Sequence, residues 1–166
     1  PILEALLNQN TAKVASIKYH MSWPGNDPMY SHNPTDANTR TNYYGISGIP
    51  QTHLDGNVFA SNPGNLNQTI IDSRYGTTSP LNISLTTSIN NGVVHVNVAV
   101  STNVNLSGNY RIHIAVVEEH VHFNTAPGTN GLTDFYNVMK KMLPNAGGTT
   151  FTSITTITPI TLSRSW

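Results

Sequence analysis

Cysteine is absent from the 166 residues of this chain. These residues therefore form no disulfide, carry no thiol catalysis and offer no thiolate to a metal. Charge is scarce too: charged residues make up 10% of the chain and the formal net charge is zero. No basic patch predicts binding to nucleic acid or anionic lipid. No apolar run approaches the roughly twenty residues that a membrane-spanning helix needs, so we expect a protein that does not span a membrane.

Recognisable catalytic signatures are missing as well. The sequence has no glycine-rich phosphate loop, no serine-histidine-aspartate context with a nucleophile elbow, and no paired carboxylates in a pocket-like setting. It therefore predicts no cofactor and no catalysis by this chain as given. Whether a longer parent protein is an enzyme stays open.

Uncharged polar residues are abundant instead. The chain has 21 Asn and 21 Thr, about a quarter of its length, so amides and hydroxyls supply the surface polarity that Lys and Glu usually supply. This composition favours a secreted or cell-surface protein, with a low-charge cytosolic domain as the alternative. The sequence opens inside a helix pattern and stops inside a strand pattern, so we expect it to be a piece of a longer protein.

The first part of the chain, residues 1–76, mixes helix and strand patterns. Pro1 suits the first turn of a helix, and a proline and a glycine bracket a second helix pattern over 34–45. Asp55-Gly56 predicts a tight turn between two short strands. The expected elements in this part are an opening helix from Pro1, a buried strand within 13–20, a helix after Pro34, strands 51–54 and 57–60, and a helix ending at Gly76.

The second part, residues 77–166, alternates apolar and polar residues. Such alternation predicts antiparallel strands with one polar face. Asn91-Gly92 predicts a hairpin turn, and Thr133 and Pro144 bracket a predicted helix over 133–143. The sequence thus predicts an α+β fold, with an α/β domain at 1–76 and a mainly antiparallel β-domain with one helix at 77–166. The residues expected to face inward in the first two strands are Leu81, Ile83 and Leu85, and Val94, Val96, Val98 and Val100.

One stretch of the first part resembles a known loop. "GISGIPQT", residues 45–52, resembles the Gly-Ile-x-Gly-Ile-Pro-Thr loop of thioredoxins, in which the proline is cis. "PILEA", residues 1–5, resembles the helix that follows the thioredoxin Cys-x-x-Cys motif. The resemblance implies a thioredoxin-like domain without its first strand and its cysteines, and a cis bond before Pro50.

A wider resemblance covers nearly the whole chain. "VASIKYHMSWPGNDPMY", "NYYGISGIPQTHLDG", "NYRIHIAVVEEHV" and "TDFYNVMKKMLP" are together similar to the outer-membrane-protein-related family of Bacteroidota, in which a thioredoxin-like domain precedes a β-domain. The resemblance implies a protein of the periplasm, the outer-membrane surface or the secreted fraction.

Two sets of residues are candidate binding sites. A cis Pro50 would turn the Ile49 backbone outward to pair with an extended peptide, and Trp23 and His53 are candidates to line the same cleft. Glu118, His120 and His122 alternate along one strand and so share a face, where they could meet one Zn²⁺. The alternative for this second set is a polar strand end that faces solvent.

Two functions follow as hypotheses. The first is a non-catalytic binding module that presents the Ile49-Pro50 edge to an extended peptide or a surface protein. The second is a fragment of a thiol-disulfide oxidoreductase whose Cys-x-x-Cys lies upstream of Pro1. A sheet without its first strand would also have an open edge, through which self-association is an alternative.

Overall fold

The structure is a computed structural model that describes residues 2–56 and 58–166. Pro1 and Asn57, predicted to begin a helix and a return strand, lie outside the described residues. The fold is α+β, with short helices and mostly antiparallel sheets. The chain forms two compact units, Pro1–Thr78 with Glu118–Val138, and Ser79–Val117 with Met139–Trp166. Residues 118–138, which the sequence pattern assigned to the second domain, thus belong to the first unit.

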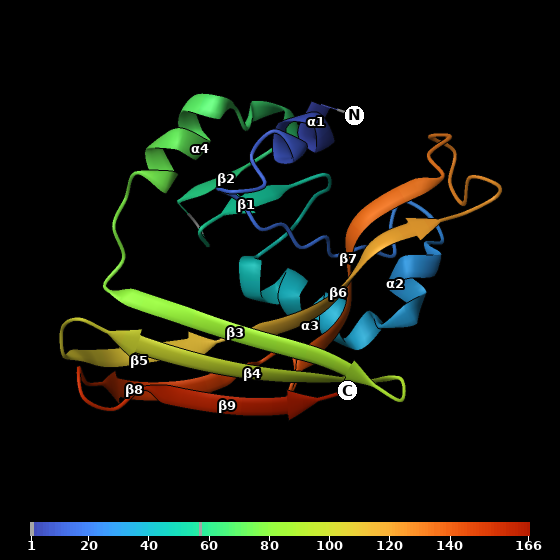
Figure 1. Cartoon of the computed structure of the whole chain (residues 1–166). Coiled ribbons are helices and arrows are strands. Elements are labelled where there is room, and N and C mark those ends of the chain that lie inside the picture. Colours follow the sequence, from blue (N-terminus) through green and yellow to red (C-terminus); the bar gives the residue numbers. More distant parts are fainter. Residues whose placement is uncertain (1, 57) are drawn as a thin grey trace. The chain divides into compact units, whose positions relative to one another are not determined.

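Short helices characterise the first unit (Figure 1), and side chains cap three of them at the N-terminus. The carboxylate of Asp27 accepts the backbone N–H groups of Met29 and Tyr30. Asn33 and Asn67 cap the two longer helices in the same way, which explains part of the asparagine content, since asparagine is among the best N-cap residues. The helices are α1 (Ile2–Asn8), α2 (Pro28–His32), α3 (Pro34–Tyr44), the 3-10 turn η1 (Pro63–Asn65) and α4 (Gln68–Tyr75).

The strands β1 (Thr52–Leu54) and β2 (Phe59–Ser61) pair antiparallel in this unit. Asp55 and Gly56 both have positive φ, 45° and 73°, as predicted for the Asp-Gly turn. Leu54 pairs with Phe59, however, so the connection is longer than the predicted two-residue turn and the return strand begins later than predicted. The buried strand predicted within 13–20 is wrong: this segment makes a single parallel bridge, Lys18 to Val138, and Ile17 is 44% exposed. Its two aliphatic side chains, Val14 and Ile17, are three residues apart and would fall on opposite faces of a strand.

The helix predicted over 133–143 is also wrong, because Asp134–Leu143 is strand β7. It forms a two-stranded sheet with β6 (Ile114–His122). Asn137 has φ 55° and breaks the strand's alternation, since Val138 and Met139 directly after it are both buried. The irregular spacing of apolar residues that this produces resembles a helical period, and pairing with β6 overrides it.

The second unit is built on antiparallel strands (Figure 1). β3 (Leu81–Asn90), β4 (Val93–Thr102) and β9 (Ile160–Ser165) form a sheet in the order β3-β4-β9, and β5 (Leu106–Ile112) pairs with β8 (Thr149–Ile154). Asn91 and Gly92 have φ 50° and 79°, which confirms the predicted hairpin turn. The buried core comprises Val96, Val98, Val100, Ile114, Leu143 and Ile154.

The strand β3 departs from its predicted burial. It lies at the edge of its sheet and pairs only with β4 among the described strands. Ile83 and Leu85 are 66% and 59% exposed, although their cross-strand partners Val100 and Val98 are buried. The central strand therefore carries the core of this sheet. Within the described residues, none of the helices is long and apolar enough to cross a membrane.

Candidate functional site

The segment that joins α3 to β1 contains the predicted cis-proline. Gly45 ends α3 with φ 65°, a left-handed cap that glycine adopts readily. The Ile49–Pro50 peptide bond is cis, which confirms that expectation. Residues 47–51 are all exposed, with Ile49 at 39%. The segment therefore presents both its main chain and an apolar side chain to solvent.

His53, in the middle of β1, is held by neighbours on this segment. Its Nδ1 lies 3.0 Å from the carbonyl oxygen of Gly56 and its Nε2 lies 3.1 Å from the side-chain nitrogen of Gln51. Because a carbonyl only accepts, Nδ1 carries the proton and Nε2 accepts from the Gln51 amide. The ring also packs on Tyr44, with centroids 4.8 Å apart. His53 thus links the cis-proline segment to the end of α3.

A buried arginine anchors the helix that leads into this segment. Arg40 is 3% exposed, and its guanidinium lies 4.3 Å from the ring centroid of Tyr43 and 4.8 Å from that of Tyr44. It also donates to the Tyr44 hydroxyl at 2.8 Å. Burial raises the pKa of the nearby Tyr19 phenol. The Tyr43-Tyr44 pair is therefore fixed by cation–π contacts and a hydrogen bond.

Trp23, the fourth predicted peptide-binding residue, belongs to the separate loop before α2. Its side chain is 37% exposed and its bond to Pro24 is cis. Asp27 at the end of this loop caps α2 and lies 2.8 Å from Nδ1 of His20. The structure thus places Ile49 and Pro50 on this segment and His53 on the strand that directly follows it, while Trp23 lies on a separate loop.

The predicted metal ligands gain a different carboxylate. His120 Nε2 and His122 Nδ1 lie 2.8 and 2.9 Å from the same oxygen, Oδ1 of Asp134. A potential ligand atom from each of the three side chains lies within 4.8 Å of the other two. Glu118 is not part of this group. It lies four residues before His122 on β6, a separation of about 13 Å along an extended strand. A residue such as Asp134 on the paired strand can lie much closer, because opposite residues of paired strands are about 5 Å apart.

Asp134 occupies this place because β7 runs beside β6. The backbone N–H of Phe123 donates to the carbonyl of Thr133 at 2.9 Å, which brings the start of β7 beside the end of β6. Hydrogen bonds from His122, Thr133 and His120, in that order of effect, hold the pKa of the Asp134 carboxyl well below its usual value. The sequence pattern did not indicate Asp134, because it predicted a helix over 133–143. A predicted hairpin, with its turn at the glycines of the 123–133 loop, would have placed Asp134 beside the two histidines.

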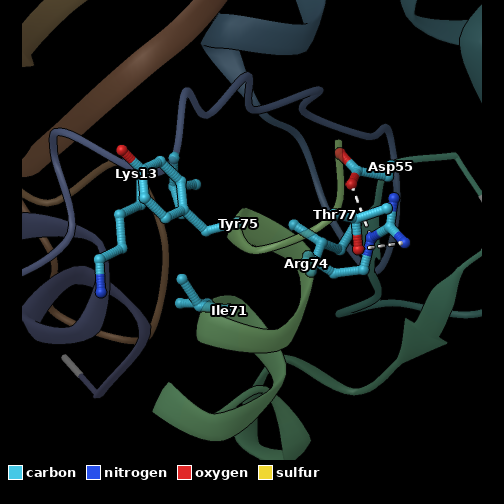
Figure 2. A pocket seen from close by; sticks show the side chains of 8 residues that line it. Lys13, Asp55, Ile71, Arg74, Tyr75 and Thr77 are labelled. Carbon is cyan, nitrogen blue, oxygen red and sulfur yellow. Dashed lines mark hydrogen bonds and ion pairs between the residues drawn. The ribbon is translucent and has the colours of Figure 1, made fainter. Parts of the chain in front are cut away.

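The first unit also has a cavity of about 240 Å³ that the sequence did not indicate (Figure 2). Its cations are engaged with carboxylates: Arg74 Nε lies 2.9 Å from Asp55 Oδ2, and Lys13 Nζ lies 2.5 Å from Asp72. Among the described residues that line the cavity, each cation therefore already has an acidic partner. Its lining comprises Lys13, Val14, Leu54, Asp55, Ile71, Arg74, Tyr75 and Thr77.

Fold and site together define an α+β protein of two compact units, with an exposed cis-proline segment and a His-His-Asp cluster in the first. No family model matches the chain, and no curated protein matches it by sequence. Among solved structures, it is similar to a crystal structure of a protein from Agrobacterium tumefaciens, with a TM-score of 0.54 and 14% identity, over 98% of this chain and 70% of that one. A similarity at this level of identity supports the fold and carries no function.

Proposed function

We propose that this chain is a non-catalytic binding module that holds an extended peptide, or an extended segment of a surface protein, along the Ile49-Pro50 segment and β1. The observation that carries the proposal is the run of exposed residues at 47–51, with its cis-proline, leading directly into β1. Among the described strands, β1 pairs with β2 alone, so an added strand would meet an edge of a two-stranded sheet. Strand addition of this kind recognises a guest through main-chain hydrogen bonds.

The thioredoxin-like character of residues 1–76 is part of the proposal. The order of the elements supports this part of the proposal. Along the chain they are α1, the extended segment at Lys18, α3, the cis-proline segment, the β1–β2 hairpin and α4. A location in the cell envelope or outside the cell is proposed from the low charge and the Asn- and Thr-rich composition. Thiol-disulfide exchange would need cysteine, which these residues lack, so binding by this chain would be non-covalent.

The chemistry of the segment favours an uncharged guest. Residues 45–54 contain no Asp, Glu, Lys or Arg, and the side chains beside Pro50 are an exposed isoleucine and the Gln51 amide. Salt screens interactions between charges and leaves apolar contacts largely unaffected. We therefore expect peptide binding to be nearly independent of ionic strength.

The test is an NMR titration of the ¹⁵N-labelled chain with short uncharged peptides. We expect shift changes confined to residues 47–54, and loss of binding when alternate peptide amides are N-methylated, because methylation removes the main-chain donors. Ile49→Asp should weaken binding by about tenfold or more, since burial of an isoleucine side chain is worth about 1.5–3 kcal/mol.

Ile2→Asp is the matched control, because Ile2 lies in the same unit and is 76% exposed. It should bind peptide like the unmodified chain. Equal binding of N-methylated and unmodified peptides, or shift changes that avoid residues 47–54, would rule the proposal out.

A further inference from the structure

We propose that His120, His122 and Asp134 form a site for one divalent transition-metal ion of the zinc class, with a coordination position open to solvent. The three side chains belong to β6 and β7, whereas the proposed peptide segment adjoins β1. The two proposals therefore stand or fall separately.

The distances suit a metal after small side-chain movements. The three ligand atoms lie within 4.8 Å of one another, and both imidazole nitrogens already contact Asp134 Oδ1. In a tetrahedral zinc site with bonds of about 2.0–2.1 Å, neighbouring ligand atoms are about 3.3 Å apart. Rotation of exposed imidazoles supplies a movement of this size, with no change needed in the backbone.

The strands and their side chains already orient the three ligands. His120 and His122 are two residues apart on β6 and so share a face. The ring of Tyr136 stacks on His120, with centroids 4.8 Å apart and planes 9° apart. The hydroxyl of Thr133 donates to Asp134 Oδ2 at 2.8 Å, which leaves Oδ1 directed at the imidazoles. Such outer contacts are typical supports of metal-ligating residues.

The donor set selects the class of ion. Two imidazoles and one carboxylate suit zinc, copper, nickel and iron. Calcium needs about six to eight oxygen ligands and magnesium an octahedron of oxygens, while this group offers one carboxylate. The side chains of His120, His122 and Asp134 are 47%, 54% and 41% exposed, so water can complete the coordination. Three protein ligands with an open position resemble exchangeable sites more than closed structural ones.

Metal binding makes a definite change in the histidine rings. In the hydrogen-bonded cluster, His120 Nε2–H and His122 Nδ1–H both donate to Asp134 Oδ1, because an ionised carboxylate only accepts. To coordinate a metal through these same nitrogens, each neutral ring must carry its proton on the opposite nitrogen. Zinc should therefore move the proton of His120 to Nδ1 and that of His122 to Nε2.

The experiment uses tag-free chain stripped of metal with a chelator and titrated with Zn²⁺ by calorimetry. We expect one ion per chain, with Ca²⁺ and Mg²⁺ giving no saturable binding. Asp134→Asn and His122→Ala should each weaken Zn²⁺ binding by at least about tenfold, the lower end of what loss of even an outer-shell partner costs. Because both side chains are exposed, these variants should keep the fold.

Glu118→Gln is the matched control, since Glu118 lies on the same strand two residues before His120, and His95→Ala controls for a histidine elsewhere. Both should bind Zn²⁺ with an affinity within about twofold of that of the unmodified chain, a much smaller change than the roughly tenfold loss expected for the ligand variants. ¹⁵N spectra of the unmodified chain should show the two ring protons moving as described. Unchanged tautomers with saturating Zn²⁺, an equal loss in Glu118→Gln, or no loss in Asp134→Asn would overturn the site.

Discussion

At the scale of residues, short polar side chains form many of the hydrogen bonds that cap helices and join neighbouring segments. Asp27, Asn33 and Asn67 each accept hydrogen bonds from backbone N–H groups in the first turn of a helix. Asn10, which is 3% exposed, exchanges amide hydrogen bonds of 2.8 Å with Gln68. An uncharged polar composition is therefore compatible with specific structure, because these groups find partners within the fold.

The pair of Lys13 and Asp72 gives a prediction at this scale. Hydrogen bonds from Lys13 and then Gln68 lower the pKa of the Asp72 carboxyl. A lowered folded-state pKa adds stability that is present above the unfolded pKa and lost as pH falls through the folded value. Lys13→Met should raise the pKa of Asp72 toward its usual value, measured by NMR titration of the carboxyl carbon. Lys140→Met should leave it unchanged, and an unmoved pKa in Lys13→Met would assign the effect to Gln68.

At the scale of elements, β7 contains a residue, Asn137, whose backbone conformation is not that of a regular strand. Asn137 has φ 55°, its carbonyl accepts from the Lys18 N–H at 2.8 Å, and its side chain donates to Ser16 Oγ at 2.8 Å. Asparagine tolerates left-handed backbone better than branched residues do. The irregular point in the strand is thus the point at which it meets the segment before α2.

Substitutions at Asn137 separate backbone conformation from hydrogen bonding. Ser16→Ala and Asn137→Gly both remove the side-chain bond, at a cost of about 0.5–1.5 kcal/mol in the free energy of unfolding. Asn137→Val should cost about 1–2 kcal/mol more than Asn137→Gly, because valine is strained at positive φ. Urea denaturation of the three variants measures this. Strand propensity alone predicts the opposite order, so a valine variant more stable than the glycine variant would contradict the assigned backbone.

At the scale of the whole molecule, the chain divides into two compact units that share β6 and β7. Ile71 belongs to the first unit and Ile154 to the second, and each is 2% exposed. Both are therefore buried core residues, one for each unit.

Truncation of these two residues tests the division. Ile71→Ala and Ile154→Ala should each lower the free energy of unfolding by about 2–5 kcal/mol, because each leaves a cavity. Amide hydrogen exchange should locate the loss in α1 and α4 for Ile71→Ala, and in β4, β5 and β8 for Ile154→Ala. An equal loss of protection throughout the chain in both variants would show one cooperative unit in place of two.

The sequence alone determined those features that depend on near neighbours. The helices α1, α3 and α4, the two left-handed turns at Asp55-Gly56 and Asn91-Gly92, and the inward valines of β4 follow from capping, φ preference and alternation over a few residues. The cis bond at Pro50 was expected from the resemblance of residues 45–52 to the thioredoxin loop.

Tertiary structure decided what depends on partners far along the chain. The segment 134–143 became a strand because β6 pairs with it, and that pairing brought Asp134 to His120 and His122 in place of Glu118. In place of the predicted strand at 13–20, the structure has one bridge at Lys18, and its partner, Val138, also lies far along the chain. Local patterns fix backbone preferences worth about 1 kcal/mol per residue, and pairing between distant segments outweighs them because it satisfies backbone groups and buries side chains together.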